Sequence, residues 1–245
     1  MNEYIVQVAN YGHIGLADQI CQQMEESAKA RGTGIAKRSP DYLIQKMLEG
    51  KAIIATDRTG DFVGFCYVET WGHGQFVANS GLIVHPEHRK SGVAKRIKEK
   101  AFELSRTKYP QAKIFGLTTS LAVMKINSSL GYEPVTFSEL TDDEAFWKGC
   151  SSCVNYDILN RTNRKHCLCT GMLFDPAEVK EKKEVERTFT KHSGLFERWL
   201  RLKERILTRR YHKEKRTSAQ PQEAMSVAKV IGSFAQLFTK AKQSA

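Results

Sequence analysis

The chain has 245 residues, of which 41% are hydrophobic and 27% are charged, so it is long enough for one packed domain with an additional segment. No apolar run reaches the roughly 18–20 residues that a membrane-spanning helix needs, which excludes a protein built from such helices. The first residues lack the pattern of a secretory signal peptide. The sequence therefore predicts a cytoplasmic protein whose six cysteines stay reduced or bind metal.

The net charge of +11 is unevenly distributed along the chain. Residues 177–245 hold 17 Lys and Arg against 8 Asp and Glu, whereas residues 1–176 are close to neutral. The basic charge therefore belongs to a C-terminal extension and says little about the substrate of the preceding domain.

The order of predicted elements indicates a mixed α/β domain. Runs of β-branched and aromatic residues predict strands at 4–9, 51–57, 62–71, 76–84, 113–119 and 132–137. Apolar residues at helical spacing predict helices at 15–31, 40–49, 93–109 and 121–130, the second with Ser39 as its N-cap and Pro40 at its first position. Short connections between residues 51 and 84 make the three strands there antiparallel neighbours.

The connection between the strand at 76–84 and the following helix has the features of an anion site. The strand ends before Pro86, a basic turn follows with Gly92 in it, and an amphipathic helix begins directly afterwards. The first backbone N–H groups of a helix have no partner within the helix, and its dipole is positive at that end. This stretch therefore predicts a binding site for a phosphate group.

Two sequence phrases resemble those of the GCN5-related N-acetyltransferase (GNAT) superfamily. Its acyl-CoA pyrophosphate loop, Q/R-x-x-G-x-G/A, is similar to Arg89-Lys90-Ser91-Gly92-Val93-Ala94. A second phrase, M-x-x-I-N-x-x-L-G-F/Y, is similar to the stretch from Met124 to Tyr132. The resemblance covers roughly residues 1–140. It implies the GNAT fold, which is a mixed, mostly antiparallel sheet flanked by helices.

The resemblance also implies where acetyl-CoA, or another acyl-CoA, would bind. In this family the fourth strand diverges from the fifth and the cofactor lies in the gap, its pantetheine arm paired with the strand and its pyrophosphate on the loop. Gly81 would mark the bulge that makes the strand diverge. The expected cofactor-binding residues are Leu82, Ile83, Val84, Arg89, Lys90, Ser91, Gly92, Val93, Ala94, Lys95 and Asn127.

The residues for proton transfer depart from the family pattern. Many relatives have Tyr, the presumed acid for the leaving thiolate, at the position of Asn127, and an amide cannot deliver a proton. Relatives often have Glu on the fourth strand, where this chain has Asn79 and Ser80. The nearest titratable candidates are Glu69 and His73, acting directly or through water, and the alternative is that both face solvent.

The acceptor site is expected beside the connection at residues 31–39, which contains three cations among small residues. Arg38 would clamp a carboxylate of the substrate, and the alternative is a solvated basic turn. The region is similar to amino-acid N-acyltransferases of the N-acetylglutamate synthase kind. We expect transfer to the primary amine of a small amino-acid-like substrate. The alternatives are acetylation of a protein lysine or N-terminus, and a catalytically weak CoA-binding scaffold or regulatory protein.

Four of the cysteines lie close together in the sequence. Cys150 and Cys153 form a C-x₂-C pair, and we expect Cys167 and Cys169 on one face of a strand at 167–174. Such spacing predicts a structural zinc site that pins the insert at 150–169. Buried free thiols and a redox pair are the alternatives.

The basic extension has two amphipathic helical patterns, at 178–216 and 224–241, separated by a linker at 217–221. Their apolar faces must be buried against the domain, a second subunit, an acidic partner or an anionic membrane surface. We expect docking on the chain itself or formation of a homo-oligomer rather than nucleic-acid binding.

Overall fold

A computed structural model describes residues 3–32, 37–179, 181 and 202 of the chain. The strands in these residues are β1 (Ile5–Val8), β2 (Ala52–Thr56), β3 (Phe62–Trp71), β4 (Phe76–Val84), β5 (Lys113–Thr118), β6 (Glu133–Val135) and β7 (Thr170–Phe174). The α-helices are α1 (Ala17–Arg31), α2 (Pro40–Leu48), α3 (Val93–Lys108), α4 (Leu121–Ser129), α5 (Glu144–Lys148) and α6 (Tyr156–Arg161). Short 3₁₀ helices occupy Tyr11–Leu16, Pro86–His88, Phe137–Glu139 and Gly149–Ser152.

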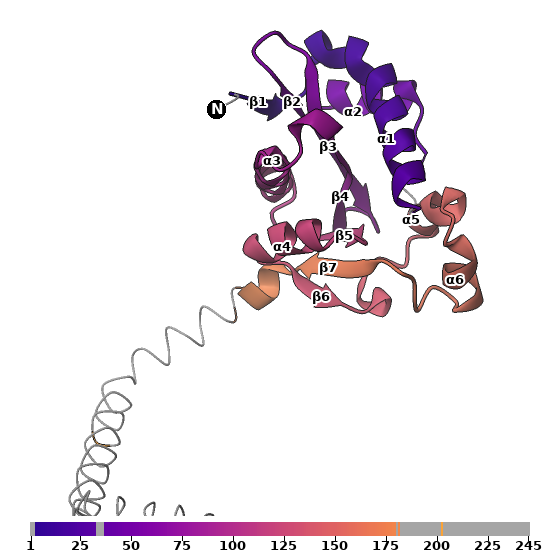
Figure 1. The fold of residues 1–245 in the computed structure, drawn as a ribbon. Helices are drawn as coiled ribbons and strands as arrows, with labels where there is room; N and C mark the ends of the chain where they lie inside the picture. The colour runs from indigo at the N-terminus through magenta and orange to yellow at the C-terminus, as the bar shows by residue number, and fades with distance from the viewer. Residues whose placement is uncertain (1–2, 33–36, 180, 182–201, 203–245) are drawn as a thin grey trace, which may run out of the picture. The chain divides into compact units, whose positions relative to one another are not determined.

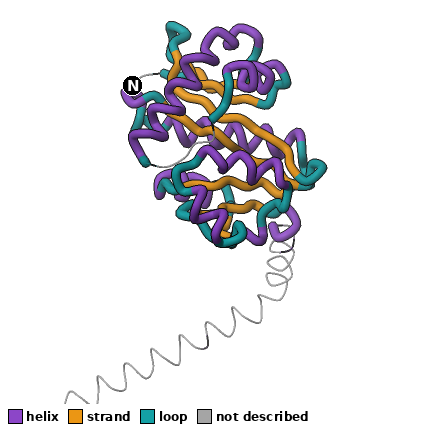
Figure 2. Tube along the Cα trace, turned by 90° about the vertical axis from the view of Figure 1, so that its right-hand side faces the viewer, coloured by secondary structure: helices purple, strands orange, loops and turns teal. Residues whose placement is uncertain are grey.

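The strands form one sheet in the order β1-β2-β3-β4-β5-β7-β6, visible as the band of strands in Figure 2. Only the β4–β5 pair is parallel, and the other neighbours in this sheet are antiparallel. The expected mixed, mostly antiparallel sheet is confirmed. Of the described helices, none is both long and apolar enough to cross a membrane.

The strands β4 and β5 are paired over only a short length. Their register joins Phe76–Ala78 to Lys113–Phe115, and the rest of β4 has no partner in β5. The backbone groups that a continuous ladder would use are therefore left along a gap between the two strands. This confirms the divergence that the sequence comparison led us to expect.

A β-bulge at Gly81 bends β4 at the point where it leaves β5. The register with β3 shifts between Phe65, which lies opposite Ile83, and Tyr67, which lies opposite Ser80. Gly81 has φ of 67°, and a Cβ atom there would lie 2.5 Å from the ring of Tyr67. Only glycine combines this positive φ with such a close approach.

Helices cover both faces of the sheet, with α1 and α2 on one side and α3 and α4 on the other (Figure 1). One buried cluster joins α1 and α2 to the sheet through Ile20, Leu43 and Phe65. A second joins α3 to the opposite face through Ile97 and Ile114. Ser39 caps α2 as expected, its Oγ accepting a hydrogen bond from the N–H of Tyr42 at 3.3 Å.

Two sequence expectations need separate comment. The strand expected at 167–174 begins only at Thr170, so Cys167 and Cys169 precede it. The amphipathic helices expected at 178–216 and 224–241, with their linker, lie outside the described residues apart from a few isolated positions.

Candidate active site

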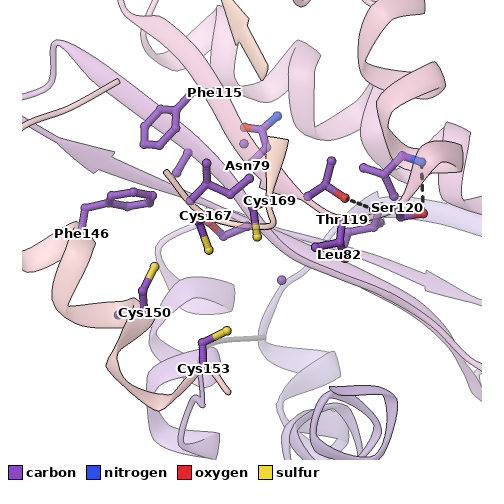
Figure 3. A pocket seen from close by; sticks show the side chains of 18 of the residues that line it. Asn79, Leu82, Phe115, Thr119, Ser120, Phe146, Cys150, Cys153, Cys167 and Cys169 are labelled. Carbon is purple, nitrogen blue, oxygen red and sulfur yellow. Dashed lines mark hydrogen bonds between the residues drawn. The ribbon is translucent and has the colours of Figure 1, made fainter. Parts of the chain in front are cut away.

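The gap between β4 and β5 opens into a pocket in the described part of the chain (Figure 3). The two strands contribute Asn79–Leu82 and Gly116–Thr118, and the beginning of α4 contributes Ser120 and Val123. Figure 3 shows that Asn79, Leu82 and Phe115 lie around the same opening as four cysteines from the later part of the chain. Residues far apart in sequence therefore meet where the sheet is interrupted.

The charged side chains in the pocket lining are all basic. Arg31, Arg38 and Lys98 line it, whereas no Asp, Glu or His of the described residues does. Burial and the nearby charge of Arg89 lower the pKa of Arg31. Cations that lack a carboxylate partner favour an anionic ligand, because its charge offsets part of the free energy that their removal from water costs.

Arg38 is held in this pocket by an aromatic frame. Its Nε donates a hydrogen bond to the hydroxyl of Tyr67 at 2.9 Å, and its Nη1 donates to the carbonyl oxygen of Lys37 at 3.0 Å. The guanidinium also lies over the ring of Tyr42, 5.0 Å from its centroid. This frame fixes the fork of donors, which is the arrangement that recognises a carboxylate.

Glu69 lies beside the pocket rather than in its lining. It is on β3 between Tyr67 and Trp71, two residues that line the pocket on the same face of the strand. Its carboxylate accepts a hydrogen bond from Tyr42 and forms an ion pair with Lys46 at 2.7 Å. Burial raises the pKa of Glu69 to about 6, and the charge of Arg38 acts against that shift.

His73 is exposed in the turn between β3 and β4, with φ of 56°. It does not line the pocket. The structure therefore places Glu69 and Arg38 close to the proposed acceptor end and leaves His73 outside it.

The predicted phosphate loop leads directly into α3. Gly92 is the N-cap with φ of 85°, and no side chain caps the helix. The backbone N–H groups from Lys90 to Ala94 donate no hydrogen bond within the described structure. A Cβ at Gly92 would meet nothing within 4 Å, so the loop offers free donors and open space for a pyrophosphate.

Two side chains of the phosphate loop, Arg89 and Ser91, form hydrogen bonds that hold it in place. Arg89 donates from Nε to the carbonyl oxygen of Val84 at 3.2 Å and from Nη2 to Ser27 at 3.2 Å. Ser91 donates to the carbonyl oxygen of His88 at 2.6 Å. Arg89 therefore ties the loop to β4 and α1, and the exposed Lys90 is the freer cation for a phosphate.

Within the gap, Leu82 and Asn127 line the pocket, whereas the side chains of Ile83 and Val84 are packed in the two cores. Asn127 is buried, and its Oδ1 has no hydrogen-bond partner in the structure. A buried amide oxygen without a partner is costly. An N–H donor of a pantetheine arm in the gap would satisfy it, so these residues fit an acyl-CoA.

Comparison with known proteins agrees with this geometry. Residues 21–124 match the Acetyltransferase (GNAT) family. The matched stretch is less than half of the chain, and it makes this part of the chain similar to a GNAT acetyltransferase domain. No curated protein matches the sequence.

Two solved structures have the same fold as this domain. N-acetylglutamate synthase from Neisseria gonorrhoeae, complexed with coenzyme A and N-acetyl-glutamate, has a TM-score of 0.51 and 16% identity, and the match covers 71% of this chain and 35% of that chain. Rv2747 from Mycobacterium tuberculosis, in complex with CoA, has a TM-score of 0.51 and 17% identity over 70% of this chain and 98% of that chain. The present chain thus spans about a third of the gonococcal protein.

The four cysteines of the expected zinc site line one wall of the pocket (Figure 3). No group of three or more His, Cys, Asp or Glu among the described residues is placed to hold a metal ion. The zinc site at Cys150, Cys153, Cys167 and Cys169 is therefore not supported. The shared strand face that would have aligned the last two is missing because β7 begins after them.

Two thiols of this wall, those of Cys150 and Cys169, are poorly ionised. Burial, reinforced by neighbouring thiols, raises the pKa of Cys150 to about 11 and that of Cys169 to about 12. Protonated thiols are weak nucleophiles and weak metal ligands. Within the structure they act as a largely apolar surface of the pocket.

Tyr67 and Lys98 are among the polar residues of the pocket lining that sequence reasoning missed. Tyr67 lies in an apolar strand and belongs to no sequence motif that indicates a function. Lys98 shares a helical stripe with Ala94, Ala101 and Ser105, so its place among small residues was a readable sign of burial.

Proposed function

We propose that this protein transfers an acyl group, most simply acetyl, from an acyl-CoA to the primary amine of a small amino-acid-like substrate. The observation that carries the acceptor class is Arg38, whose framed guanidinium lines a pocket without acidic side chains among its described lining. A carboxylate on the acceptor would complete this arrangement with two charge-assisted hydrogen bonds.

Glu69 is the best placed base for this reaction. The amine must lose a proton before or during attack on the thioester carbonyl, and a base is most effective when its pKa lies near the working pH. Glu69 has a pKa of about 6 and lies on β3 between two residues of the pocket wall. Because its carboxylate faces Tyr42 and Lys46, we expect proton transfer through an intervening water.

Donors for the developing oxyanion are present at the same place. Trp71 lines the pocket, and its Nε1 is buried without a hydrogen-bond partner. The bulge at Gly81 also interrupts the regular ladder between β3 and β4. An unpaired N–H at the reacting centre would stabilise negative charge on the carbonyl oxygen.

The direct test is release of thiol from acetyl-CoA across a panel of amino acids and their decarboxylated amines. We expect release with amino acids and at least a tenfold lower kcat/KM with the matched amines, because these lack the carboxylate that Arg38 would bind. Equal rates for both sets would contradict the acceptor class. No release with any amine, despite tight CoA binding, would favour the CoA-binding scaffold instead.

The other expectations are carried forward as proposals. The domain division at residue 176 and the homo-oligomer through the extension depend on segments outside the described residues. A cytoplasmic location also stays a prediction. Gel filtration of the full chain and of a version ending at residue 182 would test the oligomer.

A further inference from the structure

Lys98 is a buried lysine on α3 that the family resemblance does not explain. Its relative exposure is 2%, whereas Lys95 and Lys100 on the same helix form ion pairs at the surface with Glu99 and Glu103. Lys98 instead faces the sheet, within the stripe of α3 that packs on β3 and β4.

No carboxylate neutralises Lys98 in the described part of the chain. The contacts of its Nζ are the ring of Tyr132, 5.5 Å away, and the electrostatic influence of the Cys66 thiol. Burial lowers the pKa of Lys98. An unpaired buried ammonium group is costly to the fold, so its presence calls for a ligand or a reaction that uses it.

The position of Lys98 indicates which part of a ligand it would meet. Lys98 lines the pocket together with Leu82 of β4 and Asn127 of α4, two residues that face the gap between β4 and β5. In the proposed reaction the reactive end of the acyl-CoA enters this gap. Asn127 occupies the position where the family resemblance leads us to expect Tyr, and its amide cannot release a proton.

We propose that Lys98 stabilises and protonates the thiolate that leaves when the acyl group is transferred. This role rests on the proposed function. The amine nitrogen forms a bond to the thioester carbonyl carbon, the C–S bond breaks, and its electron pair stays on sulfur. The Lys98 ammonium gives one proton to that sulfur, and the proton lost by the amine leaves through Glu69. Lys98 regains its proton from solvent after the products depart.

The groups that contact Lys98 do not compete for this proton. Burial raises the pKa of Cys66 to about 11 and also raises the pKa of Tyr132, so both stay protonated near neutral pH. Asn79 and Ser105, which are hydrogen-bonded to each other at 2.8 Å, carry no charge. A lysine with a lowered pKa is also a better acid than an ordinary one.

The first test needs no acceptor. Bound CoA is compared with bound desulfo-CoA, and the ultraviolet absorbance of the thiolate is measured at pH 7.5 in the wild type, Lys98→Met and Lys100→Met. We expect a larger thiolate signal in the wild type and in Lys100→Met than in Lys98→Met, because a neighbouring ammonium group shifts part of the bound thiol to the thiolate. An equal signal in all three proteins would overturn the role of Lys98.

The second test is kinetic. With the acceptor found in the amino-acid panel, Lys98→Met should lower kcat about 100-fold, the usual range for a lost general acid, and leave the KM for acetyl-CoA within about threefold. It should also raise Tm by roughly 2–4 °C, because a buried unpaired charge is removed. Unchanged kcat would overturn the proposal, as would a loss of rate that accompanies a lower Tm in both Lys98→Met and Lys98→Gln.

Two outcomes separate this proposal from its alternatives. A thiolate signal that depends on Lys98, in a protein without turnover on any amine, would support the Lys98 site and refute the proposed function. If Lys98→Met kept its rate with acetyl-CoA and lost rate only with succinyl-CoA, Lys98 would bind a carboxylated acyl group instead. The leaving-group role would then be wrong.

Discussion

The Nε of Arg38 donates a hydrogen bond to the hydroxyl of Tyr67 at 2.9 Å, which joins the beginning of α2 to the middle of β3. Tyr67 is buried, and its ring also contacts the bulge at Gly81 closely enough to exclude a side chain there. One tyrosine therefore connects the residue that would bind the acceptor with the bend that opens the gap for the cofactor. The acceptor end and the cofactor end of the pocket share a structural support.

Replacing Arg38 should weaken acceptor binding and leave cofactor binding intact. A charge-assisted hydrogen bond contributes about 1.5–3 kcal/mol, so Arg38→Ala should lower kcat/KM for the acceptor by roughly 10–100-fold. Steady-state kinetics with both substrates varied will measure this. Arg58→Ala is the control, because Arg58 is exposed and pairs with Glu3. A rise in the KM for acetyl-CoA alone would show that Arg38 serves the cofactor instead.

The pH dependence of kcat/KM should show the ionisation of Glu69. A base works only when deprotonated, so the rate should rise as the pH increases through about 6. Glu69→Gln should remove this limb and reduce the rate by about 100-fold. Asp61→Asn, a change in the exposed turn after β2, is the matched control. If kcat/KM of Glu69→Gln still rose with pH near 6, the ionisation would belong to another group.

Gly92→Glu should abolish CoA binding without unfolding the domain. The new carboxylate would lie among the free N–H donors at the start of α3 and repel a pyrophosphate. Gly60→Glu provides the control, since Gly60 also has positive φ, 93°, and open space around it. Calorimetry should show at least a 100-fold weaker Kd for Gly92→Glu, and thermal unfolding should show similar Tm values for both variants. Equal affinities would refute the phosphate loop.

Cys150 and Cys169 should react slowly with iodoacetamide at neutral pH. The raised pKa values of Cys150 and Cys169, about 11 and 12, leave little thiolate at pH 7. The rate of alkylation, measured by mass spectrometry, should therefore rise about tenfold for each unit of pH. Bound acyl-CoA and acceptor should protect both residues. Rapid alkylation at pH 7 would indicate that something in the native protein lowers these pKa values.

Most elements of the fold were predictable because their signals are local. The helix α2 follows from Ser39 and Pro40 at its start, and β2, β3 and β4 follow from apolar runs joined by short turns. The short helices α5 and α6 were not predicted, and the last strand begins later than expected. Cys167 and Cys169 carry apolar side chains in a pattern suited to a strand, but pairing with β5 and β6 begins only at Thr170 and Gly171.

The sequence by itself predicted an anion site at residues 89–94, because such a site depends on a short continuous stretch whose backbone donors precede a helix. The resemblance of that stretch to the GNAT loop then led to an acyl-CoA as the expected cofactor. The acceptor end depended on residues distant in sequence, and only the tertiary structure brought Arg38 to Tyr67. The same holds for Lys98, whose burial depends on how α3 packs over the sheet. Charge and pKa follow from three-dimensional surroundings, and those surroundings decided which polar groups face the reaction.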